Sequence, residues 1–176
     1  MLILVTGGSK CGKSRFAENL IEKNYFDWDV KKYYVATMEP FSKDAGEIIK
    51  RHRDMRSGKG FETIEKYRDI DKINVDKSSV ILLECVGNLC ANEMFSGEYN
   101  ENVFEKVSGE IIDLSMKCEL LIAITNQVGE DGMEYLSETK KYIENMVKIN
   151  ERLAFEAEMV VEMVYGIPLY LKGNKN

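Results

Sequence analysis

The sequence contains one histidine and two prolines among its 176 residues, and it has no long uncharged apolar run. The longest such runs, Val80–Leu83 and Leu120–Thr125, are far too short to cross a bilayer, which takes about 20 apolar residues. Met1–Thr6 leads into glycines without the basic leader or cleavage site of a secretory signal. We therefore expect a cytoplasmic protein without membrane insertion. A single histidine also excludes any site that needs several imidazoles.

The four cysteines contain no CxxC pair. Without two close pairs the sequence argues against a zinc site, and without a secretory signal it argues against disulfides. We expect reduced thiols, with Cys85 and Cys118 buried and Cys11 in a glycine-rich loop.

Acidic residues outnumber basic ones by 30 to 24, which gives a net charge of −6. This balance argues against a broad nucleic-acid-binding surface, although a local anion site is compatible with it. A hydrophobic fraction of 44% with 31% charged residues is typical of a globular protein with a substantial core. The length predicts one domain over residues 1–176.

Strand and helix patterns alternate along the chain. The alternation predicts an α/β fold with a mostly parallel sheet flanked by helices. A turn at Tyr165-Gly166 followed by Pro168–Lys172 predicts an antiparallel hairpin at the C-terminal edge. The other predicted strands are Met1–Thr6, Tyr33–Thr37, Phe61–Glu65, Ser79–Cys85, Leu120–Thr125 and Met159–Val164, and the predicted helices are Lys13–Lys23, Asp44–Met55, Val103–Leu114 and Leu136–Ala157.

A G-x-x-x-x-G-K-[ST] motif lies between the first predicted strand and the first predicted helix. Such a loop directs backbone N–H groups at a phosphate, and the helix dipole favours the anion. Lys13 is expected to reach the β- and γ-phosphates and Ser14 to bind Mg²⁺, so a nucleoside triphosphate is the expected ligand. The alternative is a chance glycine turn. The motif consists of Gly7, Gly8, Ser9, Lys10, Cys11, Gly12, Lys13 and Ser14.

Glu84 directly follows the apolar run Val80–Leu83. P-loop folds carry an acidic residue at the end of a second buried strand, where it supports Mg²⁺ or orients an attacking hydroxyl. We therefore predict that Glu84 lies at the edge of the sheet where ligands bind. The alternative is a solvent-facing strand end.

A basic segment, Lys50–Lys59, holds the only histidine, His52. Arginines in such a segment can bind phosphates. On spacing alone, packing on a helical stripe is favoured for His52 over nucleophilic catalysis, because a lone histidine on such a stripe is more often a packing residue.

The motifs along nearly the whole chain resemble those of the bifunctional adenosylcobinamide kinase / adenosylcobinamide-phosphate guanylyltransferase family. The P-loop is shared with many kinases, whereas the ordered set is specific. The matching segments are Thr6–Arg15, Tyr34–Thr37, Ile49 with His52, Arg53 and Arg56, Phe61–Glu65, Leu82–Cys85, Thr125–Gly129, Asn150–Ala154 and Val164–Pro168.

The resemblance implies a P-loop NTPase-like, RecA-like fold and two activities. In the kinase activity, ATP or GTP held at Lys13 and Ser14 phosphorylates adenosylcobinamide. In the guanylyltransferase activity, His52 attacks the α-phosphate of GTP and carries GMP to adenosylcobinamide phosphate, with Mg²⁺ as cofactor. The resemblance makes His52, Lys13 and Glu84 the catalytic residues. It also implies that the protein forms a homotrimer. Beyond the P-loop, the resemblance places Thr37, Met38, Glu39, Arg53, Asp54, Met55, Arg56, Glu65 and Glu84 near the nucleotide.

Several positions depart from the family pattern. Gln127 replaces a usual glutamate, Gly87 a usual threonine or serine, and Ile48 a frequent arginine; the other departures are Phe61, Val147 and Glu151. They leave guanylyl transfer as the better supported activity. Two alternatives stay open, the first with His52 merely packing and the second motivated by Gln127 and Gly87. These are a plain P-loop small-molecule kinase and a nucleotide-binding regulatory protein that has lost catalysis. A nucleic-acid ATPase is a weaker alternative because the positive charge is confined to one segment.

Overall fold

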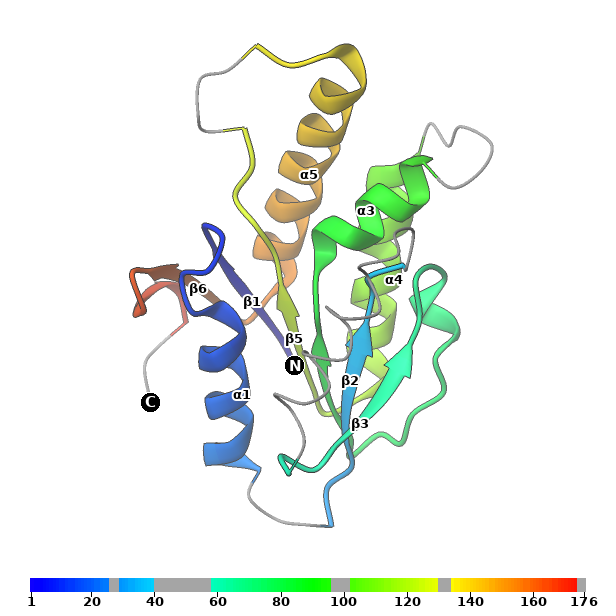
Figure 1. Ribbon diagram of the computed structural model, residues 1–176. Coiled ribbons are helices and arrows are strands. Elements are labelled where there is room, and N and C mark those ends of the chain that lie inside the picture. The colour runs from blue at the N-terminus through cyan, green and yellow to red at the C-terminus, as the bar shows by residue number, and fades with distance from the viewer. Residues whose placement is uncertain (26–28, 40–57, 96–101, 130–133, 174–176) are drawn as a thin grey trace.

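A seven-stranded sheet forms the centre of the computed structural model, which describes residues 1–25, 29–39, 58–95, 102–129 and 134–173 (Figure 1). Its strand order is β3-β2-β4-β5-β1-β6-β7, and only β7 runs antiparallel to its neighbour. The predicted parallel α/β sheet with a C-terminal edge hairpin is therefore confirmed. The strands are β1 (Leu2–Gly7), β2 (Lys32–Ala36), β3 (Phe61–Glu65), β4 (Val80–Leu83), β5 (Leu120–Ile124), β6 (Met159–Val164) and β7 (Ile167–Lys172).

Helices cover both faces of the sheet (Figure 1). One face packs against three helices that also contact one another, whereas α1 packs against the other face. The helices are α1 (Lys13–Asn24), α3 (Val86–Phe95), α4 (Val103–Lys117) and α5 (Ser137–Glu156), with a short 3₁₀ turn at Ile70–Lys72.

The apolar run of β1 is buried on both faces because successive side chains of a strand point in opposite directions. Leu2 and Leu4 join the core beneath α3, α4 and α5, whereas Ile3 and Val5 join the core beneath α1. The runs in β4 and β5 divide in the same way. Continuous apolar strands of this kind are typical of a parallel sheet covered on both sides, which is why the sequence predicted them.

Most predicted elements agree with the observed ones to within one to three residues at each end. The clear omission is α3, which the sequence did not predict because Gly87, Asn88 and Asn92 interrupt its apolar pattern. Two of these polar or small positions, Gly87 and Asn92, are buried. The predicted helix Asp44–Met55 lies entirely outside the described residues.

The four cysteines are free thiols that differ in burial. Cys118 and Cys90 are buried, whereas Cys85 and Cys11 are only partly buried, so the expectation for Cys85 was too strong. Burial raises the pKa of the Cys118 thiol to about 11 and that of Cys90 to about 12. Among the described helices, none combines the length and apolar character that a membrane span requires.

Candidate active site at the P-loop

The P-loop connects β1 to α1 through backbone conformations that favour glycine. Gly7 and Gly12 have φ of 135° and 101°, and α1 begins directly after Gly12. A Cβ atom at Gly7 would lie 2.5 Å from the carbonyl oxygen of Met163 in β6. Only a glycine therefore lets the loop approach β6 this closely. The exposed residues Gly8, Ser9 and Lys10 form the outer part of the loop.

Lys13 is held inside the loop. Its side chain is only 8% exposed, and its Nζ donates to the carbonyl oxygens of Gly7 at 2.8 Å and Gly8 at 2.6 Å. Burial lowers the pKa of Lys13, and the neighbouring thiols of Cys11 and Cys85 oppose this shift. The ammonium group is thus placed at the mouth of an anion-binding loop, in partly desolvated surroundings where its attraction to a phosphate is strengthened.

Ser14 lies in the first turn of α1 with an exposed side chain. Glu84 follows β4 at the carboxyl edge of the same sheet, as the sequence predicted, and is partly buried. A hydroxyl and a carboxylate are oxygen ligands of the kind Mg²⁺ accepts alongside phosphates. These two residues therefore fit the ion that the P-loop implies.

Thr37 fixes the position of Glu84. The backbone N–H of Thr37 donates to Oε2 of Glu84 at 3.0 Å, and its hydroxyl donates to the carbonyl oxygen of Cys85 at 3.0 Å. Its own carbonyl accepts a bond of 2.9 Å from the buried side chain of Asn92 in α3. The same amide donates to the carbonyl of Tyr67 at 2.9 Å. One residue from α3 thus joins the segments that follow β2 and β3.

The other predicted residues of this edge follow β2 and β3. Glu39 forms an ion pair with Arg68 at 3.4 Å, and Glu65 accepts from the hydroxyl of Tyr67 at 3.3 Å. Met38 is partly buried between Thr37 and Glu39. Because the carboxyl ends of parallel strands meet at one edge, the structure gathers these residues and the P-loop on the same side of the sheet.

The predicted nucleophile and its basic neighbours lie outside the described residues, namely His52, Arg53, Asp54, Met55 and Arg56. Lys59, at the end of this basic segment, is described. Its Nζ lies 2.5 Å from Oε2 of Glu18 in α1, so this end of the segment is attached to the P-loop helix. His52 lies seven positions before Lys59 in the sequence, which corresponds to at most about 25 Å of fully extended chain.

Three comparisons with known proteins bear on this fold and site. The family model described as cobinamide kinase / cobinamide phosphate guanyltransferase matches residues 3–171. The chain belongs to this family. It is therefore an enzyme of the P-loop type, and the predicted resemblance is confirmed.

Curated relatives match over almost the whole chain. The bifunctional adenosylcobalamin biosynthesis protein CobU of Escherichia coli (strain K12) is 29% identical over 98% of this chain and 100% of its own length. The CobU protein of Salmonella typhimurium (strain LT2) is 28% identical, with the same shares covered. Among solved structures, the ATPase domain of G40P superposes with a TM-score of 0.51 at 12% identity, covering 92% of this chain and 68% of that one. This last likeness supports the P-loop NTPase fold alone.

Two sequence segments of the cobinamide kinase / guanyltransferase family meet behind the P-loop. The hydroxyl of Thr125, which follows β5, donates to Oδ1 of Asn150 in α5 at 2.6 Å. The amide of Asn150 donates in turn to the carbonyl of Asn126 at 3.3 Å. The sequence indicated both segments as motifs, but only the fold shows that they bind each other.

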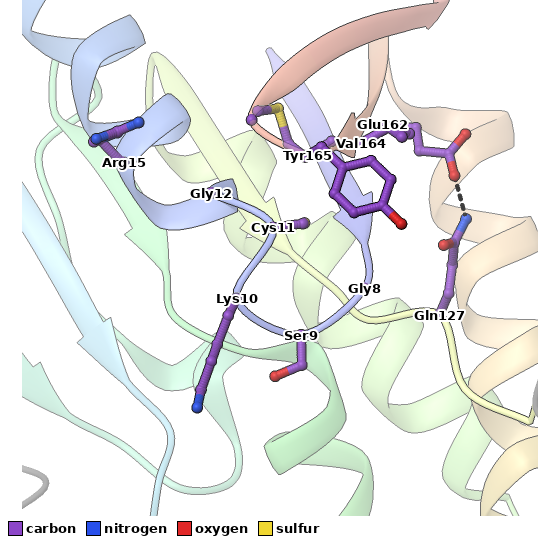
Figure 2. Close-up of a pocket in the computed structure, with 12 residues that line it drawn as sticks. Gly8, Ser9, Lys10, Cys11, Gly12, Arg15, Gln127, Glu162, Val164 and Tyr165 are labelled. Atoms are coloured by element: carbon purple, nitrogen blue, oxygen red, sulfur yellow. Dashed lines mark hydrogen bonds between the residues drawn. The ribbon is translucent and has the colours of Figure 1, made fainter.

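Two of the positions that depart from the family pattern, Gln127 and Gly87, have defined partners in the fold. Gln127 donates through Nε2 to Oε1 of Glu162 in β6 at 2.8 Å (Figure 2). A Cβ atom at Gly87 would lie 2.8 Å from the hydroxyl of Tyr142, which itself donates to the Gly87 carbonyl at 3.4 Å. These two departures are thus each matched by a neighbouring side chain. Sequence reasoning did not identify Asn92, Glu162 or Tyr142, because each contacts its partners across 25 or more residues.

Proposed function

We propose that this chain phosphorylates adenosylcobinamide with ATP or GTP, and transfers GMP from GTP to adenosylcobinamide phosphate through His52. The observation that carries the proposal is the buried Lys13 ammonium inside a complete P-loop, on the same sheet edge as Glu84, in a chain that belongs to the cobinamide kinase / guanyltransferase family.

For the kinase activity, the phosphates lie against the backbone N–H groups of the P-loop. Lys13 exchanges its bonds to Gly7 and Gly8 for bonds to phosphate oxygens. The hydroxyl of the corrinoid attacks the γ-phosphorus, the bond between that phosphorus and the β–γ bridging oxygen breaks, and a nucleoside diphosphate leaves. Glu84 orients the hydroxyl and accepts its proton. Thr37 supports this role because its N–H holds one oxygen of the carboxylate.

For the guanylyl activity, a neutral imidazole nitrogen of His52 attacks the α-phosphorus of GTP, and pyrophosphate leaves. The resulting N–P bond breaks when a phosphate oxygen of adenosylcobinamide phosphate attacks the same phosphorus, which regenerates the imidazole. Arg53 and Arg56 offset the negative charge that develops on the phosphate. The chain offers one histidine only, so this chemistry has one possible site.

Mg²⁺ held by Ser14 and supported by Glu84 supplies positive charge that neutralises the phosphates. The residues of the chain do the remaining work of binding, orientation and proton transfer. The homotrimer implied by the resemblance stays a prediction.

The decisive experiment incubates the full chain with α-labelled GTP and Mg²⁺. We expect an acid-labile label, equal in mass to one GMP, on the peptide that contains His52, together with release of pyrophosphate. His52→Ala abolishes the label and keeps γ-phosphate transfer to adenosylcobinamide, whereas Lys13→Ala impairs γ-phosphate transfer.

The plain-kinase alternative has a distinct outcome in the same assay. It gives γ-phosphate transfer without pyrophosphate release and without a labelled histidine. Label that persists in His52→Ala would overturn the His52 assignment. Binding of GTP without turnover of either corrinoid would favour the regulatory alternative.

A further inference from the structure

A pocket of about 790 Å³ opens beside the P-loop, on the side away from Glu84. Lys10, Cys11 and Arg15 line it on the loop and helix side, and Tyr165, Glu162 and Gln127 line the opposite side (Figure 2). None of the last three belongs to the predicted nucleotide-binding residues. The pocket therefore shares one wall with the phosphate loop, and its other wall comes from the segment after β5, from β6 and from the β6–β7 turn.

The sheet order fixes which end of a nucleotide can reach this pocket. β1, which carries the P-loop, has β5 and then β4 with Glu84 on one side, and β6 with the pocket on the other. A triphosphate with its γ-phosphate at Lys13 and toward Glu84 therefore directs its nucleoside away from Glu84, toward β6.

The demands of folding do not explain why residue 165 is a tyrosine. It forms the β6–β7 turn with Gly166, and both residues have positive φ, 49° and 83°. Asparagine and glycine suit such a turn, whereas a bulky residue in the left-handed region is strained. The tyrosine side chain gains no burial in return, since it is 95% exposed. A large exposed ring in a strained turn indicates a role in binding.

The turn is held against the P-loop, which gives the ring a defined position. The N–H of Gly166 donates to the carbonyl of Cys11 at 3.0 Å. Figure 2 shows the ring of Tyr165 projecting into the space between the loop and the Gln127–Glu162 pair. Aromatic rings placed in this way serve as stacking platforms for bases.

We propose that this pocket is the nucleoside subsite for the triphosphate bound by the P-loop, with Tyr165 stacking on the base. Glu162, oriented by its 2.8 Å bond from Gln127, accepts a hydrogen bond from an N–H or O–H group of the nucleoside. The inference rests on the proposed function only in requiring that the P-loop bind a triphosphate.

The proposed subsite lies apart from the other segment of this edge that is expected near a nucleotide. The segment after β2, where the family resemblance places a nucleotide, is three strand positions from β1, or about 14 Å at 4.8 Å per strand. The pocket lies on the opposite side of β1. The proposed base subsite is thus distinct from the segment after β2 on the same sheet edge.

The test compares the binding of ATP, GTP and inorganic triphosphate to the full chain by titration calorimetry with Mg²⁺. Tyr165→Asn relieves the backbone strain, so we expect a more stable protein that binds both nucleotides about 5- to 100-fold more weakly. Its affinity for inorganic triphosphate stays within twofold of wild type. Tyr165→Phe keeps nucleotide affinity, and Ile167→Ala, at an exposed position of the same hairpin, is the matched control.

Three outcomes contradict the inference. Unchanged nucleotide affinity in Tyr165→Asn overturns the subsite and leaves the proposed function intact. An equal loss for inorganic triphosphate would show that the turn acts through the P-loop and not through the base. If wild type binds neither inorganic triphosphate nor nucleotides, both the subsite and the proposed function fail.

Discussion

Removal of the Asn92 side-chain amide tests how the active-site edge is held together. This amide is 5% exposed and donates to two carbonyl oxygens, those of Thr37 and Tyr67, both at 2.9 Å. Asn92→Ala takes the donor from both carbonyls. A buried acceptor that loses its partner costs about 1–2 kcal/mol, so we expect the free energy of unfolding to fall by about 2–4 kcal/mol.

Urea unfolding measures this loss, and Asn24→Ala provides the matched control. The amide of Asn24 makes one exposed bond of 2.7 Å to the carbonyl of Leu20 in its own helix. We expect the control to change stability by less than about 0.5 kcal/mol. A loss in Asn92→Ala no larger than in the control would refute the reasoning that Asn92 joins the two segments.

The charge-bearing variant Asn92→Asp adds a pH dependence with a definite sign. Its carboxyl group faces two carbonyl oxygens, so burial and repulsion raise its pKa above the unfolded value of about 4. Stability is then highest below that value and is lost as the pH rises through the folded-state pKa. If the stability of Asn92→Asp relative to wild type is constant from pH 4 to pH 8, the pKa of the introduced carboxyl group is not raised and the reasoning is wrong.

Two further predictions concern Glu110 and Gly87. Burial raises the pKa of Glu110 to about 7 from 4.5, despite a bond from the Ile70 N–H and the nearby Lys106, so its contribution to stability is lost as the pH rises from about 4.5 to 7. Glu110→Gln should therefore flatten that part of the pH profile of the free energy of unfolding, by an amount on the order of 1–2 kcal/mol after solvent screening. An unchanged slope of this profile would contradict the raised pKa of Glu110. Gly87→Ala brings a Cβ within 2.8 Å of the Tyr142 hydroxyl, so it should be stabilising, by about 0.5–1 kcal/mol, only in a Tyr142→Phe background. A double-mutant cycle with zero coupling would argue against this contact.

The sequence predicted the parts of the fold that depend on local patterns. The apolar runs of β1, β4 and β5 and the glycine motif between β1 and α1 are each contained in a few consecutive residues. The position of Glu84 also followed, because an acidic residue after a buried strand has to lie at the carboxyl edge of the sheet.

The rest of the site depends on contacts that no local pattern encodes. Asn92 lies 55 residues from Thr37, and Glu162 lies 35 residues from Gln127. Helix α3 was not predicted for a related reason. Its buried Asn92 binds two carbonyl oxygens, so a polar residue occupies a position where the helical pattern would show an apolar one. The strand order, which puts β6 beside the P-loop, likewise follows from packing of the whole chain.

The P-loop lies between two segments that are each fixed by their own hydrogen bonds, and this arrangement favours one orientation of a triphosphate for phosphoryl transfer. On one side, Thr37 joins β2, β4 and α3 through its N–H, hydroxyl and carbonyl, so Glu84 cannot turn without breaking a bond to the segment that Asn92 holds. On the other side, the bond from Gly166 to Cys11 holds the Tyr165 turn against the loop. Both sets of contacts are made within the protein and do not need the nucleotide. The acceptor hydroxyl and the nucleoside would then meet a loop whose two sides are already fixed, and binding would require ordering of the ligand more than of the protein.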